Sequence, residues 1–262
     1  MKQRVITAIV ALLIFIPVII AGGYVIDFAA IVLGIIAMSE IFIMKKKMII
    51  SVEALISFIG ISCLIVPTNF SNFLPEYLSP AFIFYVLVML LLLATVFSKN
   101  RFNFDDAGVY TLGMMYIGFG FHYFIVARQD GLTTLLYALF IVWCTDSGAY
   151  FIGKHFGKNK LAKHISPNKT WEGSIGGTVI ATIVCTIYLY FFPISGINLI
   201  VMIGFTIILS IFGQLGDLVE SALKRFYGVK DSGKILPGHG GILDRFDSLL
   251  FVLPVLHLLG IV

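Results

Sequence analysis

The chain has 262 residues, of which 59% are hydrophobic and only 12% are charged, and its formal net charge is +4. A water-soluble domain has roughly 45–50% apolar and about 25% charged residues, so this composition excludes an ordinary soluble protein. Apolar runs of about 20 residues, enough to cross a hydrocarbon core of about 30 Å, recur along the whole length. The composition indicates an all-α polytopic integral membrane protein.

Nine apolar segments are predicted to cross the membrane as helices. In chain order they are residues 4–22, 24–44, 48–67, 79–97, 107–127, 132–152, 173–192, 197–217 and 242–262. The first resembles a signal peptide because Lys2 and Arg4 precede it. It is longer than the apolar region of such a peptide and lacks a good cleavage site, so we expect it to be retained.

The basic residues are distributed unevenly over the loops between these segments. If the segments alternate in direction, every lysine and arginine except Arg128 falls on one side of the membrane. Positively charged loops stay in the cytoplasm, which predicts a cytoplasmic amino terminus and a carboxy terminus outside. A missed or extra segment would destroy this partition, so it also supports the count of nine.

Acidic residues lie within the last predicted segment. The residues after Asp247 are too few to cross about 30 Å at about 1.5 Å per helical residue. We therefore expect the last helix to begin near Ile242, which places Asp244, Arg245 and Asp247 in the inner part of the bilayer. In a continuous helix, Asp244, Asp247 and Ser248 would share one face.

Two other predicted segments also carry acids toward the cytoplasmic end. Asp217, Glu220, Ser221 and Lys224 follow the spacing i, i+3, i+4, i+7, which predicts a single polar stripe on one helix. Asp146 lies near the inner end of its own segment. Ionisable groups at the centre of a membrane helix cost at least about 2.5–3.5 kcal/mol and usually face a polar cavity. We expect one shared polar chamber; internal ion pairs, such as Asp244 with Lys224 or Asp247 with Arg245, are the alternative explanation.

The residue types near these acids indicate a phosphate site. Clustered carboxylates without cysteine ligands or a paired-histidine motif favour Mg²⁺ over zinc. Lysine and arginine bind phosphate groups, and glycines allow backbone N–H groups to approach an anion. Such basic residues are Lys224, Arg225, Lys230, Lys234 and Arg245, and the glycines are Gly233, Gly238, Gly240 and Gly241. No P-loop motif is present, which argues against a Walker-type NTPase.

The segment SALKRFYGVKDSGKILPGHGGILDRFD resembles the signature of the bacterial phosphatidate cytidylyltransferase (CDP-diacylglycerol synthase) family. Its matching positions are Ser221, Leu223, Lys224, Arg225, Lys230, Asp231, Gly233, Leu236, Pro237, His239, Gly240, Gly241, Asp244, Arg245 and Asp247. The segments DSGAYFIGKHFGK, at 146–158, and SPNKTWEG, at 166–173, resemble the same family. The resemblance covers about residues 143–262, whereas the first 140 residues match only as a multi-span region.

The resemblance implies that CTP and phosphatidic acid condense to CDP-diacylglycerol and pyrophosphate in a Mg²⁺-dependent reaction. It assigns the metal to Asp217 and Asp244 and implies a second cation such as K⁺. The expected partners are CTP, phosphatidic acid and membrane lipids, with no nucleic acid; a homodimer agrees with the family but has no signal in the sequence. It implies the bacterial inner (cytoplasmic) membrane, with residues 1–130 as a scaffold and residues 131–262 as the catalytic region.

The phosphate of phosphatidic acid is already a nucleophile at neutral pH, so the reaction needs no strong general base. The individual residues are therefore expected to bind cations and phosphate groups. The residues expected to act in catalysis are Asp217, Asp244, Lys224 and Arg225. Those expected at the substrates are Lys230, Asp231, His239, Arg245, Asp247, Asp146, Lys169 and Ser221. His239 has an alternative as a turn residue that hydrogen-bonds the backbone. Asp146 and Asp231 would hold metal-bound water or orient lysines.

Two other functions compete with this interpretation. Acids inside a membrane also mark ion pathways in transporters, but the polar motifs all follow residue 143 and no inverted repeat is visible. A CTP-dependent kinase acting on a lipid alcohol is the nearer rival, and it would need to activate a hydroxyl group.

Overall fold

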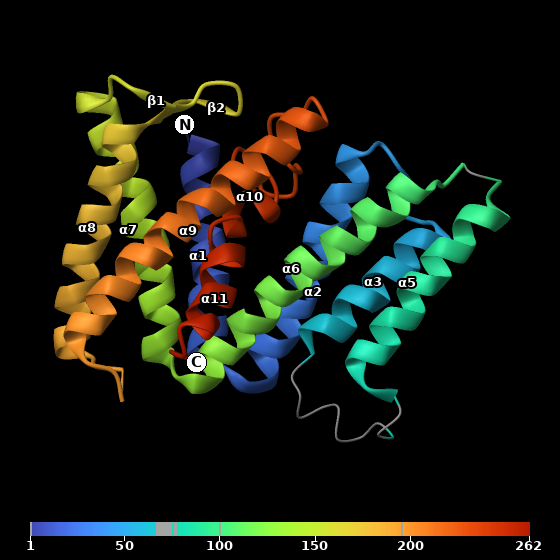
Figure 1. Cartoon of the computed structure of the whole chain (residues 1–262), viewed down its shortest axis with the longest axis horizontal. Helices are drawn as coiled ribbons and strands as arrows, with labels where there is room; N and C mark the ends of the chain where they lie inside the picture. Colours follow the sequence, from blue (N-terminus) through green and yellow to red (C-terminus); the bar gives the residue numbers. More distant parts are fainter. Residues whose placement is uncertain (1, 67–74, 76–77, 100, 195) are drawn as a thin grey trace. The chain divides into compact units, whose positions relative to one another are not determined.

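The computed structural model describes residues 2–66, 75, 78–99, 101–194 and 196–262 (Figure 1). Its elements are α1 (Lys2–Ala21), α2 (Gly23–Met44), α3 (Val52–Ile65), α5 (Pro80–Phe97), α6 (Phe104–Asp130), α7 (Leu132–Phe156), β1 (Lys160–Ala162), β2 (Ser166–Thr170), α8 (Trp171–Phe191), α9 (Leu199–Phe226), α10 (Leu243–Phe246) and α11 (Leu249–Leu258). Each of the nine predicted segments contains a helix, and residue 67, the predicted end of the third segment, lies outside the described residues.

Within the described part of the chain, 6 helices are long and apolar enough to cross a membrane, namely α2, α5, α6, α7, α8 and α9. Three shorter apolar helices cover Val5–Ala21, Val52–Ile65 and Leu249–Leu258. This result confirms an all-α, multi-pass membrane protein. Nine crossings and the sides of the two termini stay predictions.

The helices form two compact units. The first consists of Met1–Val126 and Asp231–Asp244, and the second of Ala127–Lys230 and Arg245–Val262. The segment Asp231–Asp244, which belongs to the family signature, therefore packs with the amino-terminal helices. The division into a scaffold of residues 1–130 and a catalytic region of residues 131–262 stays a prediction about function.

The first unit is held by helix packing and by ion pairs at one end of α2. Helix α2 packs against α1 and α3, and α3 packs against α5. The rings of Phe42 and Tyr110 stack with their centroids 4.0 Å apart, which joins α2 to α6. Just after α2, Lys45 and Lys47 place their Nζ atoms 2.7 and 2.9 Å from the Asp106 carboxylate. Two cations on one carboxylate fix the start of α6 beside the end of α2.

In the second unit, small residues allow α7 and α8 to approach closely. A Cβ atom on Gly148 would lie 3.0 Å from the Cα atom of Gly177, and a Cβ atom on Gly173 would lie 2.7 Å from the carbonyl oxygen of Ala149. Membrane helices use such small residues at their contacts because lipid supplies no hydrophobic force between them. Helix α9 then packs against α7, α8 and α11.

The predicted continuous last helix is wrong. The chain forms the four-residue helix α10, turns at Asp247 and Ser248, and resumes as α11. The Ser248 N–H group donates to the Asp247 Oδ1 atom at 2.7 Å, so this side chain binds the backbone at the break. Asp244 and Asp247 therefore do not lie on one face of a continuous helix, and they fall in different units.

A short hairpin was not expected between α7 and α8. Strands β1 and β2 are antiparallel, with Lys160 opposite Thr170 and Ala162 opposite Ser166. The Thr170 hydroxyl accepts a hydrogen bond from the Gly173 N–H group at 3.1 Å and caps α8. Glu172 accepts from the Lys158 and Asn159 N–H groups, at 3.1 and 3.2 Å respectively. These contacts fix the hairpin to the first turn of α8.

Candidate active site

The hairpin brings a lysine to the acidic stripe of α9. Lys169 is the penultimate residue of β2, and its Nζ atom lies 2.5 Å from the Oδ2 atom of Asp217. The two side chains are 26% and 29% exposed, so the pair is accessible. A cation and an acid from separate sequence motifs therefore meet in the second unit.

Three acids of the second unit form one electrostatic cluster. The negative charges of Asp217 and Asp146 act on the Asp247 carboxylate, and that of Asp217 acts on Asp146. Basic side chains interact with the same acids: Lys224 with Asp247, and both Lys169 and Arg245 with Asp146. These interactions place Asp146, Asp217 and Asp247, which come from three predicted segments, in one electrostatic environment. A shared polar chamber stays a prediction.

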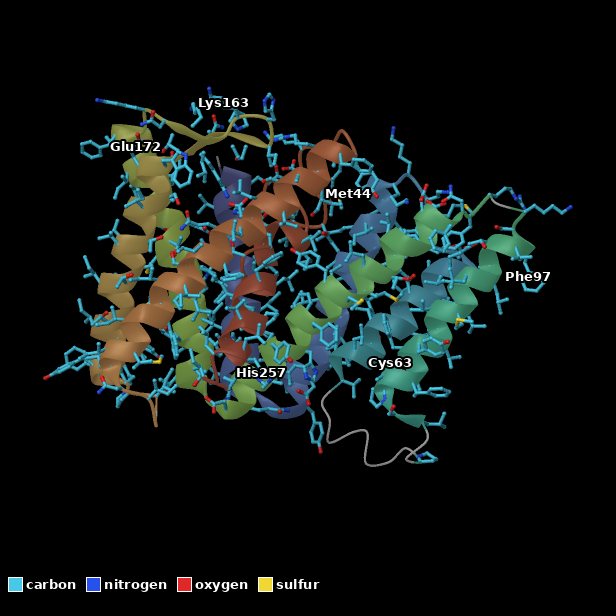
Figure 2. All side chains as sticks on the ribbon, in the orientation of Figure 1. Met44, Cys63, Phe97, Lys163, Glu172 and His257 are labelled. Atoms are coloured by element: carbon cyan, nitrogen blue, oxygen red, sulfur yellow. The ribbon has the colours of Figure 1, made fainter. Side chains whose placement is uncertain are left out.

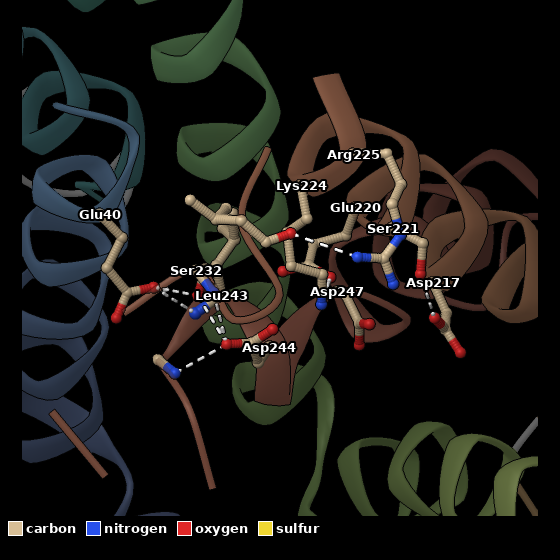
Figure 3. A network of polar contacts seen from close by, with 12 residues as sticks. Glu40, Asp217, Glu220, Ser221, Lys224, Arg225, Ser232, Leu243, Asp244 and Asp247 are labelled. Carbon is tan, nitrogen blue, oxygen red and sulfur yellow. Dashed lines mark hydrogen bonds and ion pairs between the residues drawn. The ribbon is translucent and has the colours of Figure 1, made fainter. Parts of the chain in front are cut away.

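The predicted stripe on α9 is confirmed as one helical face, because all four residues lie within α9. The Ser221 hydroxyl donates to the Asp217 Oδ1 atom at 3.3 Å, and Lys224 forms an ion pair with the fully buried Glu220 (Figure 3). Glu220, which was not among the expected site residues, therefore orients Lys224.

Arg225 donates hydrogen bonds to backbone carbonyl groups in two segments, the hairpin turn and the residues just after α9. Its Nε–H group donates to the carbonyl oxygen of Ile165, at 3.2 Å, in the hairpin turn. Its Nη1 group donates to the carbonyl oxygen of Val229, at 3.3 Å. The side chain is exposed, so in this structure Arg225 links the hairpin to the end of α9. Its expected phosphate contact stays a prediction.

In the first unit, Asp244 is held by the loop that precedes it (Figure 3). Its Oδ2 atom accepts from the N–H groups of Ser232 and Gly241, both at 2.8 Å, and from the Ser232 hydroxyl at 2.9 Å. The same loop bends at Gly238 and Gly240, which have φ angles of 78° and 89°. Positive φ angles favour glycine, which explains two of the signature glycines.

The glycine-rich loop was expected to approach a phosphate, but in this structure part of it approaches protein carboxylates. The Gly241 N–H group already donates to Asp244. A Cβ atom on Gly241 would collide with Glu40 and Ser232, and one on Gly233 would collide with Glu40. These two glycines are needed because the Glu40 side chain packs directly against the backbone.

Sequence reasoning missed Glu40, which lies near the end of α2 and is only 2% exposed. Its carboxylate accepts from the Ile242 and Leu243 N–H groups, at 2.7 and 2.9 Å, and from the Ser232 hydroxyl at 2.8 Å. A single acid in an apolar run carries no spacing pattern. The one feature that could have identified Glu40 is that an acid within an apolar segment is costly to bury, so such a residue usually has a specific role.

The remaining expected site residues are distributed over both units. Lys230 and Arg245 belong to the second unit and are exposed. Asp231 is exposed and His239 is half-buried, and both belong to the first unit together with Asp244. The His239 N–H group donates to the Leu236 carbonyl oxygen at 2.9 Å, so the backbone of His239 stabilises the turn.

The acids fit magnesium as donors. Among the described residues, no group of three or more His, Cys, Asp or Glu side chains forms a ready-made metal site. Magnesium does not require one, because it is usually held by one or two carboxylates, water and substrate phosphates. In the second unit, the half-exposed carboxylate of Asp217, with Lys169 beside it, suits a metal that arrives with a nucleotide.

Comparison with known proteins gives the class of this protein. The family model described as "Cytidylyltransferase family" matches residues 2–262. The chain belongs to this family and is an enzyme, a nucleotidyltransferase.

Curated relatives cover almost the whole chain. The phosphatidate cytidylyltransferase of Staphylococcus aureus (strain COL) is 48% identical over 259 residues, which are 99% of this chain and 98% of the relative. That of Bacillus subtilis (strain 168) is 48% identical over 264 residues, with 99% and 97% covered. The similarity therefore extends over the amino-terminal helices, beyond the part for which the sequence motifs implied a resemblance.

Proposed function

We propose that the chain is a Mg²⁺-dependent CTP:phosphatidate cytidylyltransferase that makes CDP-diacylglycerol and pyrophosphate on the cytoplasmic face of the membrane. The names of its relatives support the substrates. The observation that carries the site assignment is the Lys169–Asp217 pair, at 2.5 Å, within the cluster that includes Asp146 and Asp247. It combines acids that suit a cation with lysines that suit phosphate.

In the proposed reaction, a phosphate oxygen of phosphatidic acid attacks the α-phosphorus of CTP. A new P–O bond forms, the bond from the α-phosphorus to the bridging oxygen breaks, and pyrophosphate leaves with that electron pair. The nucleophile is already an anion at neutral pH, so the protein must mainly position two anions and neutralise their charge. Lys169 and Lys224 are proposed to do this, because each is held beside an acid that orients it.

Bound magnesium would neutralise the phosphates and align them for in-line displacement. Asp217, in the second unit, and Asp244, in the first, are each proposed as metal-binding carboxylates because the family signature implies this role, and a second cation such as K⁺ is proposed as well. Other phosphate contacts are proposed for Arg225, Lys230 and Arg245. Asp146 and Asp247 would orient cations of the second unit or hold water, and Asp231, in the first unit, is proposed to hold water or to orient a lysine. Ser221 would orient Asp217 through their hydrogen bond at 3.3 Å. His239 is proposed to contact the substrates.

The arrangement of the second unit supports a cytoplasmic site. Helices α7, α8 and α9 alternate in direction, so that the hairpin and the end of α9 lie at one end (Figure 1). Lys163 and Glu172 lie at this end, whereas His257 lies at the other (Figure 2). The basic end would face the cytoplasm. We propose the bacterial inner membrane as the location.

Product analysis with the purified protein tests the proposed reaction. Phosphatidic acid, Mg²⁺ and CTP labelled at the α-phosphate should give a labelled lipid that comigrates with CDP-diacylglycerol. Label that enters lipid only from γ-labelled CTP would identify a kinase instead. Absence of labelled lipid with either nucleotide, in a preparation that binds CTP and is folded, would refute the proposal.

The metal role is tested by Asp244→Asn, which should remove turnover while the protein stays folded. The exposed acid Asp105 offers a matched control, and Asp105→Asn should retain activity. Near-normal turnover of the Asp244→Asn variant would exclude a metal role for Asp244.

A further inference from the structure

We infer that Glu40 is a positioning residue of the active site, which acts through Ser232 and the Gly241–Leu243 backbone to orient Asp244. The inference rests on the proposed function of Asp244. All of these residues belong to the first unit. They connect a transmembrane helix of the amino-terminal region with the loop of the family signature.

The contacts of Glu40 account for both of its carboxylate oxygens. Oε1 accepts from the Ile242 N–H group at 2.7 Å, and Oε2 accepts from the Leu243 N–H group at 2.9 Å and from the Ser232 hydroxyl at 2.8 Å. A carboxylate that is 2% exposed is costly unless hydrogen bonds compensate for lost water. Since all three donors come from the segment around Asp244, this segment compensates for the burial of Glu40.

Ser232 connects the two acids. Its hydroxyl oxygen lies 2.8 Å from Glu40 Oε2 and 2.9 Å from Asp244 Oδ2. A serine hydroxyl has one proton, so it can donate to only one of these oxygens at a time. The backbone N–H groups of Ser232 and Gly241 donate to Asp244 at 2.8 Å in either case. A change at Glu40 therefore alters the hydrogen bond available to Asp244.

The packing of the loop depends on the same carboxylate. The Gly233 and Gly241 positions lie so close to Glu40 that a Cβ atom on either would collide with it. Glu40 thus sets the path of the backbone that delivers both N–H donors of Asp244. A role limited to filling space in α2 would not require hydrogen bonds with three residues of the segment that holds Asp244.

The test uses the full chain in detergent, with Glu40→Gln as the first variant. Glutamine keeps the size but places an amide NH₂ group against N–H and O–H donors, so at least one hydrogen bond is lost. Hydrogen exchange of the substrate-free protein should become faster at peptides covering 231–244. Turnover should fall about 10- to 100-fold, as for other residues that orient a metal ligand, while the KM for CTP changes far less. The Mg²⁺ concentration that gives half-maximal turnover should rise.

Asp27 provides the control, because it is a second buried acid on α2. Asp27→Asn should change neither the exchange of 231–244 nor the Mg²⁺ requirement. If Glu40→Gln prevents folding, Ser232→Ala removes only the shared hydroxyl and should show the same shift in Mg²⁺ requirement to a smaller degree.

The inference is overturned if Glu40→Gln leaves the exchange of 231–244 unchanged. It is also overturned if exchange becomes faster but turnover and Mg²⁺ requirement stay at the wild-type values, since Glu40 would then be structural only. Failure of the proposed function is a separate result: Asp244→Asn would be active, or the wild type would make no CDP-diacylglycerol.

Discussion

The Nζ atom of Lys169 lies 2.5 Å from the Oδ2 atom of Asp217 and joins the hairpin to α9. Thr170 and Glu172 fix the residues beside Lys169 to the first turn of α8. The backbone that carries Lys169 is therefore fixed independently of the ion pair with Asp217. This arrangement is suited to a cation that must stay in place when a phosphate competes for it.

We expect Lys169→Met to lower kcat about 100-fold, the typical loss when one group that stabilises the transition-state charge is removed. Steady-state assays with CTP and phosphatidic acid measure this effect. Lys163, which is exposed in the same hairpin, provides the control, and Lys163→Met should retain activity. A double variant, Lys169→Asp with Asp217→Lys, should stay inactive; recovery of activity in it would show that the pair serves only the fold.

Gly241→Ala should destabilise the protein by about 1–3 kcal/mol, because the new methyl group collides with Glu40 and Ser232 in a packed site. Thermal unfolding in detergent measures this change. Gly204, within α9, is a matched control because a Cβ atom there would meet nothing within 4 Å. Gly204→Ala should be neutral or slightly stabilising, and equal effects of the two substitutions would contradict the close approach at Gly241.

The part of the site that was predictable from the sequence depends on helical spacing. Residues three and four apart share a helix face, so Asp217, Ser221 and Lys224 could be placed together once the segment was recognised as a helix. The family motifs supplied Lys169 as a candidate, and Asp146 was marked by its position inside a predicted segment, but spacing alone could not show that Lys169 reaches Asp217. That contact depends on a hairpin whose strands are too short to leave a pattern.

The wrong prediction at the carboxy terminus also has a physical cause. Counting residues against bilayer thickness assumes a single straight helix, whereas the chain breaks at Asp247 and Ser248. Asp247 then binds the backbone at the break, and Asp244 binds the preceding loop. Glu40 was missed because its partners lie about 200 residues away in the sequence, at Ser232, Ile242 and Leu243.

A chain of buried and half-buried polar groups should stabilise the second unit. The Thr178 hydroxyl accepts from the Ser210 hydroxyl and from the Gln214 amide, both at 3.0 Å, and joins α8 to α9. Thr178→Val keeps the shape but leaves two donors of α9 without this acceptor. We expect a loss of about 1–3 kcal/mol in the free energy of unfolding. Thr182, whose hydroxyl donates within α8 at 2.7 Å, is the control, and Thr182→Val should cost clearly less.

The sidedness of the active site can be tested by labelling single cysteines introduced at the two ends of the second unit. Lys163 lies in the basic hairpin and Gln129 near the end of α6, and both are exposed. In a variant that lacks Cys63, Cys144 and Cys185, a maleimide that cannot cross membranes should label Gln129→Cys in intact cells after any outer barrier is removed. It should label Lys163→Cys only after the membrane is opened, because the basic loops are predicted to be cytoplasmic. Labelling of both cysteines from the same side would contradict the alternation of α7 with its neighbours, and the reverse pattern would place the proposed site outside, where CTP is not supplied.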